Sequence, residues 1–123
     1  MITIGIIHTH QILVDALRYL FYDQAEFNLV GSASTAAEGL NLVERTAPFV
    51  VLLEYGIPGG SSLDLITDIK RCSPGTNIIL MAASLEESLL IRAVNYGANG
   101  YFCMKNCLEE LLATVSAAPA TVN

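Results

Sequence analysis

Short apolar runs recur along the chain at intervals that suit strands separated by helices. The runs are continuous rather than alternating and are rich in Ile, Val and Leu, which is typical of parallel strands buried on both faces. They occupy residues 2–7, 27–30, 49–53, 78–81 and 101–103. We therefore predict five buried strands with helices lying between them.

The segments between the strands carry apolar residues at helical spacing. The predicted core-facing positions are Ile12, Ala16 and Leu20, then Leu65, Ile66 and Ile69, and then Leu90, Ala93, Val94 and Gly97. Three polar residues also precede a glutamate by three positions, a spacing that satisfies two backbone amides at a helix start. These pairs are Thr35 with Glu38, Ser84 with Glu87 and Asn106 with Glu109, and they predict helices near 35–46, 85–96 and 107–117.

Turns that contain glycine or proline separate these elements at residues 58–60, 73–75 and 97–100, so that a β-α unit is repeated five times. With right-handed crossovers, such a chain forms an α/β fold with a doubly wound, five-stranded parallel sheet. A length of 123 residues fits one domain, which we predict over residues 1–117. Residues 118–123 are predicted to be a disordered tail or a truncated linker.

Composition narrows the classes of partner. A net charge of −6 with only six scattered Lys and Arg argues against direct nucleic-acid binding. No apolar stretch approaches the roughly 20 residues of a membrane-spanning helix, and the N-terminus lacks a basic region that precedes an apolar one, as a signal peptide has. We therefore expect a cytoplasmic protein without a membrane partner. Cys72, Cys103 and Cys107 are expected to stay reduced, a redox pair of Cys103 and Cys107 being the alternative.

Ligands of an open parallel sheet bind beyond the carboxyl ends of its strands, where the helices diverge. The residues at these ends are therefore the candidates for a functional site: His8, Thr9, Glu54, Ala82, Met104 and Lys105. Only Glu54 among them is negatively charged. A small flavodoxin-like enzyme is disfavoured, because no phosphate-cradling glycine loop follows the first strand and no set of nucleophile, base and orienting residue is evident.

Three stretches carry a resemblance to a known family. Residues 47–54 (Ala-Pro-Phe-Val-Val-Leu-Leu-Glu), followed by Ile57-Pro58-Gly59, look like the strand, phospho-acceptor and turn of bacterial response-regulator receiver domains. Residues 93–101 are similar to that family's Gly-Ala-x-Gly-Tyr stretch, and residues 108–111 (Leu-Glu-Glu-Leu) match its last helix. The chain most resembles the receivers that carry LuxR/NarL-type helix-turn-helix outputs, which His10 also matches. The resemblance spans essentially the whole chain and implies the CheY-like strand order 2-1-3-4-5.

The resemblance implies a phosphorylation site from which this sequence departs. Glu54 stands where the acceptor aspartate belongs, and His8 and Thr9 replace the family's two acidic magnesium ligands. Because Mg²⁺ requires oxygen ligands, we expect magnesium binding to be lost. The extra methylene of Glu54 also moves its carboxylate away from the geometry of in-line phosphoryl transfer.

The family's switch and lysine positions are altered as well. Ala82 replaces the hydroxyl residue that would bond an acyl phosphate, whereas Tyr101 matches the switch aromatic. Met104 takes the place of the lysine, and Lys105 follows one residue later. The two-residue period of a strand points Lys105 to the opposite face unless a bulge shifts it.

From these departures we predict an atypical receiver domain of a two-component response regulator that is not an enzyme and needs no cofactor. It would act through phosphorylation-independent protein–protein interaction. The partner is expected to be a protein, and a second copy of the chain is one candidate. The alternative is a residual phospho-acceptor or metal-responsive receiver that uses Glu54 and Lys105 in phosphorelay signalling. No output domain is present in these 123 residues.

Several roles remain open at this level. Glu54 is either an inert remnant or a charge that stands in for a phosphoryl group. His8 is either a satisfied pocket histidine or a pH-sensitive partner of Glu54. His8, His10 and Glu54 together are also suited to zinc or nickel, if the two histidines converge.

Apolar residues beside the predicted core positions of two helices are either additional core or an interaction face. They are Leu13, Leu17, Tyr19, Phe21 and Tyr22 in the first helix and Leu85, Leu89 and Ile91 in the fourth.

Overall fold

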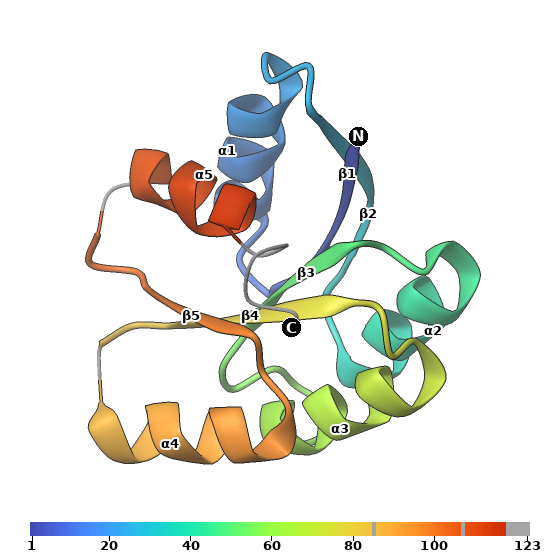
Figure 1. Cartoon of the computed structure of the whole chain (residues 1–123), viewed down its shortest axis with the longest axis vertical. Coiled ribbons are helices and arrows are strands. Elements are labelled where there is room, and N and C mark those ends of the chain that lie inside the picture. Colours follow the sequence, from blue (N-terminus) through green and yellow to red (C-terminus); the bar gives the residue numbers. More distant parts are fainter. Residues whose placement is uncertain (85, 107, 118–123) are drawn as a thin grey trace.

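The computed structural model describes residues 1–84, 86–106 and 108–117, in which five strands alternate with five helices (Figure 1). The strands are β1 (Ile2–Ile7), β2 (Phe27–Ala33), β3 (Val50–Glu54), β4 (Asn77–Ala82) and β5 (Gly100–Cys103). The helices are α1 (Gln11–Tyr22), α2 (Ala36–Thr46), α3 (Ser62–Cys72), α4 (Glu87–Tyr96) and α5 (Leu108–Ala117).

The strands form one parallel sheet in the order β2-β1-β3-β4-β5. Helices α1 and α5 lie together on one face, and α2, α3 and α4 follow one another on the other (Figure 1). The predicted doubly wound fold and its strand order are therefore confirmed. None of the helices in the described ranges is long and apolar enough to cross a membrane.

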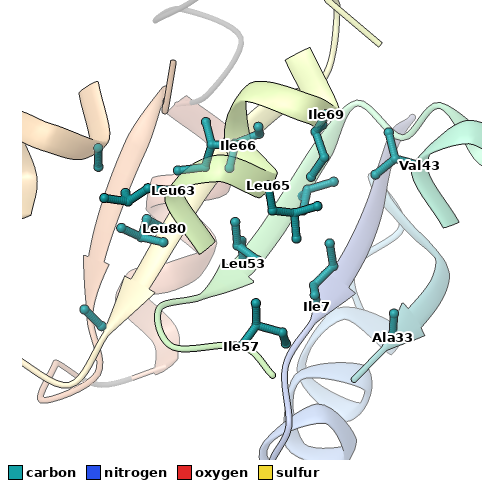
Figure 2. Close-up of a cluster of buried hydrophobic side chains, with 14 of the residues drawn as sticks. Ile7, Ala33, Val43, Leu53, Ile57, Leu63, Leu65, Ile66, Ile69 and Leu80 are labelled. Carbon is teal, nitrogen blue, oxygen red and sulfur yellow. The ribbon is translucent and has the colours of Figure 1, made fainter. Parts of the chain in front are cut away.

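Successive side chains of the central strands contribute to two separate cores, because they point to opposite faces of the sheet. In β3, Val51 and Leu53 pack on the α2–α4 side, while Val50 and Leu52 pack on the α1–α5 side. Figure 2 shows the first core, in which Ile66 of α3 is fully buried. The continuous apolar runs of the sequence reflect this double coverage.

The predicted helix caps are correct in part. Thr35 caps α2, and its Oγ1 accepts from the Glu38 amide at 3.2 Å. The reciprocal bond goes elsewhere, since the Glu38 carboxylate accepts from the Ser34 amide at 3.2 Å. The Ser84 cap is wrong: α4 begins after Glu86, whose side chain makes no capping bond.

The predicted core face of α1 is correct only in part, since Leu20 is half-buried against the core. The buried residues are Val14, Leu17 and Phe21, whereas Ile12 is 87% exposed. This helix carries two apolar stripes, and the one that includes Phe21 packs on the sheet. There the ring of Phe21 meets the ring of Phe27 of β2 edge to face, with 5.2 Å between the ring centroids. Among the apolar residues whose role the sequence left open, Leu17 and Phe21 thus belong to the core, whereas Tyr19 and Tyr22 are exposed.

Helix α3 packs as predicted, through Leu65, Ile66 and Ile69. Helix α4 packs only partly as predicted. The predicted core residue Ala93 is buried, and so is Leu89, whose role the sequence left open. Ile91 and the predicted core residue Val94 are 53% and 58% exposed. Among its neighbouring elements, this helix packs chiefly against α3, so a narrower stripe is buried than the sequence suggests.

Some predictions fall outside the described residues. These are the contribution of Leu85, the pairing of Cys103 with Cys107, the capping role of Glu109 and the tail at residues 118–123. Among the residues that the structure describes, Cys72 and Cys103 take part in no disulfide.

Candidate functional site

A pocket of about 290 Å³ opens at the carboxyl ends of β1, β3 and β4. This is the place where an open parallel sheet binds ligands. Its lining residues are His8, His10, Leu13, Glu54, Tyr55, Met81, Ala83 and Met104. The sequence identified His8, Glu54 and Met104 from their positions after strands, whereas Leu13, Tyr55, Met81 and Ala83 were missed.

Glu54 is the centre of the polar contacts in this pocket. Its side chain is 14% exposed, and its Oε1 accepts two hydrogen bonds from Thr9, at 2.9 Å from the amide and 2.7 Å from Oγ1. Thr9 reaches Glu54 because β1 and β3 are adjacent and in register up to Ile7 and Leu53. One carboxylate oxygen is therefore held by Thr9 and the other remains for the histidines.

The two histidines converge on that second oxygen. Glu54 Oε2 lies 3.6 Å from His8 Nε2 and 3.3 Å from His10 Nδ1. The His8 side chain is only 5% exposed, and its Nδ1 accepts from the His10 amide at 3.1 Å. This bond turns the chain back over His8 before α1 begins and brings the largely exposed ring of His10 to the pocket.

These contacts set the charges of the site. Burial lowers the pKa of His8 below its ordinary value, and the proximity of His10 adds to this, although attraction to Glu54 opposes it. Burial alone would raise the pKa of Glu54, but the Thr9 hydrogen bonds and the neighbouring His8 and His10 outweigh it and lower the pKa. Near neutral pH the pocket therefore holds an ionised carboxylate beside a neutral, buried imidazole.

The loop after Glu54 is fixed by Ser62, which sequence reasoning missed. The buried Ser62 hydroxyl donates to the Glu54 carbonyl oxygen at 2.7 Å. It also accepts from the amides of Gly56 and Ile57 at 3.0 and 3.2 Å. A serine directly after the cap of α3 was the available signal, since a hydroxyl there can satisfy amides of the preceding loop.

The predicted switch positions lie beside the pocket rather than in it. Ala82 is buried at the end of β4 and packs in the core on the α2–α4 side. The Tyr101 hydroxyl donates to the Ser84 carbonyl oxygen at 2.7 Å, and burial raises the pKa of this tyrosine. The Tyr101 hydroxyl is therefore held by a backbone acceptor.

Met104, and not Lys105, occupies the pocket. Met104 lines the pocket and its amide donates to the Ala82 carbonyl at 2.8 Å. The pairing of β4 with β5 runs evenly from Ile79–Gly100 to Ala82–Cys103, with no bulge that would bring Lys105 round. The Lys105 side chain is exposed and is not among the residues that line the pocket.

With this geometry established, comparison with known proteins identifies the family. The model of the response regulator receiver domain matches residues 4–116. The chain belongs to this family. The receiver domain is 31% identical over 105 residues to the transcriptional regulatory protein YhcZ of Bacillus subtilis, which covers 85% of this chain and 49% of YhcZ. It is 28% identical over 118 residues to the nitrate/nitrite response regulator NarL of Escherichia coli, covering 96% of this chain and 55% of NarL.

The receiver domain thus spans about half the length of these curated relatives. Solved structures agree with the fold. A LuxR-family response regulator from Aurantimonas superposes with a TM-score of 0.91 at 22% identity, covering 98% of this chain and 86% of that one. The isolated receiver of RcsB from Salmonella enterica, solved with the phosphomimetic BeF₃⁻, gives a TM-score of 0.87 at 20% identity, covering 97% and 88%. The predicted membership near LuxR/NarL-type receivers is confirmed.

Proposed function

We propose that this receiver domain signals without phosphorylation, through interaction with a protein partner. The observation that carries the proposal is the set of contacts around Glu54. The carboxylate at the acceptor position is tied by Thr9 at 2.9 and 2.7 Å and faces two imidazoles. An attacking oxygen needs freedom and in-line placement toward a phosphoryl donor. Here Oε1 of Glu54 is hydrogen-bonded to Thr9, and Oε2 faces the imidazoles of His8 and His10.

The donor set of the pocket does not fit the magnesium ion that the family resemblance implies. Mg²⁺ demands near-octahedral oxygen coordination and is held in proteins through carboxylates and waters. Of the residues that line the pocket, Glu54 alone is a carboxylate, and its Oε1 is already bonded to Thr9. The acidic-pair positions supply the imidazole of His8 and the hydroxyl of Thr9 in place of carboxylates.

The remaining positions that the family resemblance assigns to phosphorylation support the same conclusion. Met104 offers a thioether where a lysine ammonium would neutralise a phosphoryl group. Ala82 offers no hydroxyl to bond it, and Tyr101 is already bonded to Ser84. Our alternative, a phospho-acceptor pocket that employs Lys105, receives no support from an exposed Lys105 outside the pocket.

Exposed apolar side chains favour a protein partner. Ile12, Tyr19 and Tyr22 of α1 are 87%, 78% and 84% exposed. Tyr19 and Tyr22 line an open groove on this helix together with Asp15 and Arg18. Large apolar groups left in water at this density are typical of an interaction surface. The low number of basic residues keeps a nucleic-acid partner for this domain disfavoured.

The test is a titration of the isotopically labelled domain with magnesium and beryllofluoride, followed in two-dimensional amide spectra. We expect the amides of Glu54, Ala82 and Tyr101 to stay unchanged, because no acyl-phosphate analogue can form at a carboxylate held in this way. A receiver with an intact acidic pocket serves as the positive control. Saturable shifts at these three residues would contradict the proposal and would direct the search to a kinase partner.

A further inference from the structure

We propose that His8, His10 and Glu54 form a binding site for a first-row transition-metal dication of the zinc or nickel type. This inference goes beyond the proposed function and does not depend on it. One nitrogen from each histidine and one oxygen of Glu54 all lie within 4.8 Å of one another. Imidazole and carboxylate are the ligands that such ions prefer.

The distances are close to those that a bound ion requires. Around tetrahedral Zn²⁺, bonds of about 2.0–2.1 Å place neighbouring ligand atoms about 3.3 Å apart. Glu54 Oε2 already lies 3.6 Å from His8 Nε2 and 3.3 Å from His10 Nδ1. The His8–His10 pair needs the largest adjustment, and His10 can make it because its side chain is 73% exposed.

Neighbouring groups hold two of the three ligands in place. Thr9 bonds Oε1 of Glu54 and thereby directs Oε2 toward the histidines, as outer-shell partners of metal-ligating carboxylates do. His8 is fixed by its burial at the end of β1. The pocket of about 290 Å³ leaves room for water at the remaining coordination position.

Metal binding displaces two contacts that the structure shows, and the longer one joins Thr9 Oγ1 to His10 Nδ1 at 3.4 Å. His8 Nδ1 accepts a hydrogen bond from the His10 amide at 3.1 Å, which places the ring proton on Nε2. When Nε2 coordinates the ion, this proton moves to Nδ1 and the bond to the His10 amide is lost, with no net release of a proton. One neutral hydrogen bond corresponds to about fivefold in affinity. That is a small factor beside the contribution of a third ligand.

The consequence for the fold is a link between two elements. A bound ion would join the start of α1, through His10, to the end of β3, through Glu54. These are the two segments that meet at the pocket, so the metal would act at the place where a phosphoryl group acts in the family resemblance. The domain would then respond to a metal ion at this pocket.

The experiment uses the whole chain, free of any tag and stripped of metal by a chelator. Zn²⁺ is titrated by calorimetry, and Co²⁺ is followed by its visible absorption. We expect one ion per chain, with an affinity that falls at least about 100-fold in His10→Gln and in Glu54→Gln, because loss of a ligand costs more than loss of an outer-shell partner. Asp15→Asn replaces an exposed carboxylate of α1 that does not line the pocket, so it is the matched control and should bind as the wild type does.

Two further measurements make the outcome decisive. The chain has only two histidines, so the ring nitrogens of both can be assigned in long-range nitrogen spectra. We expect Zn²⁺ to shift His8 Nε2 and His10 Nδ1. A variant with all three cysteines replaced by serine should retain the affinity. Binding that persists in His10→Gln but vanishes without the cysteines, or no binding at millimolar metal, would overturn the inference.

The two proposals fail separately. Saturable beryllofluoride binding would contradict signalling without phosphorylation and leave the metal site intact. Absence of Zn²⁺ binding would remove the metal site and leave the proposed function as it stands. Because His10 is exposed, His10→Gln tests the ligand set even if the buried His8 cannot be replaced without unfolding.

Discussion

The hydrogen bond from Thr9 Oγ1 to Glu54 is the contact whose energetic value is most directly testable. It is 2.7 Å long and its acceptor is a carboxylate that is 14% exposed. A hydrogen bond to a charged group contributes about 1.5–3 kcal/mol to stability. Because Thr9 is exposed and water can replace part of the bond, the lower end applies. We expect Thr9→Val to lower the free energy of unfolding by about 1.5 kcal/mol.

The assay is a double-mutant cycle in urea. Thr9→Val is measured in the wild type and in Glu54→Met, which has a similar volume but no acceptor. In the Glu54→Met background, Thr9→Val should cost close to nothing, so the coupling free energy is about 1.5 kcal/mol. In thermal unfolding, the single substitution should lower Tm by about 5 °C for a domain of this size. Thr9→Ser, which keeps the hydroxyl, is the control and should stay near the wild type.

The same substitution has a second, independent readout. The Thr9 side-chain bond is one cause of the lowered pKa of Glu54, so Thr9→Val should raise that pKa toward its ordinary value. Carbon NMR of the Glu54 carboxyl during an acid titration measures it directly. If Thr9→Val cost the same in both backgrounds and left the pKa of Glu54 unchanged, the bond would contribute nothing and the account of the pocket would be wrong.

Two further predictions concern the packing and the pH response. A Cβ at Gly39 of α2 would lie 2.7 Å from the Cδ1 of the fully buried Ile7. Overpacking costs about 1–3 kcal/mol and the gain in helix propensity returns about 1. Gly39→Ala should thus lose about 1 kcal/mol in urea unfolding, whereas Gly75→Ala, which meets nothing within 4 Å, should not. Without metal, stability should fall as the pH drops below 6.5, because the unfolded chain protonates His8 before the folded one does. It should fall again as the pH drops through the lowered pKa of Glu54. His8→Gln should remove the first step and make the second one smaller, because His8 is one cause of the lowered pKa of Glu54, as urea midpoints at several pH values will test.

Much of the fold could be predicted from the sequence because the strands carry an unusually strong signal. The run at β3 is apolar on both sides, since Val51 and Leu53 meet one layer of helices and Val50 and Leu52 the other. Helix α1 gave a weaker signal, because apolar residues surround most of it. Only tertiary packing, through the contact of Phe21 with Phe27, selects the face that is buried.

The location of the candidate site could be predicted from the sequence, but the contacts between its side chains could not. The rule that parallel strands end at a common edge placed His8 and Glu54 together. That His10 also reaches Glu54 depends on the turn held by its own amide bonded to His8 Nδ1, a contact that no spacing rule encodes. The role of Thr9 was likewise hidden, since only the structure brings both its amide and its hydroxyl to one oxygen of Glu54.

The residues at positions 8, 9, 10 and 54, where the family resemblance implies departures from a phosphorylation site, contact one another, and these contacts bear on our proposal for the site. Thr9 donates twice to Glu54, and the imidazoles of His8 and His10 face the oxygen that Thr9 leaves free. A shorter carboxylate at position 54 would withdraw from these partners by one methylene. Glu54→Asp alone should therefore weaken the existing contacts without restoring magnesium binding, because the acidic ligands at positions 8 and 9 would still be absent. Recovery of beryllofluoride binding would require acidic residues at positions 8 and 9 together with aspartate at position 54. If Glu54→Asp alone bound beryllofluoride with magnesium, His8 and Thr9 would be compatible with binding of a phosphoryl group. Glu54 alone would then account for the proposed loss of that binding.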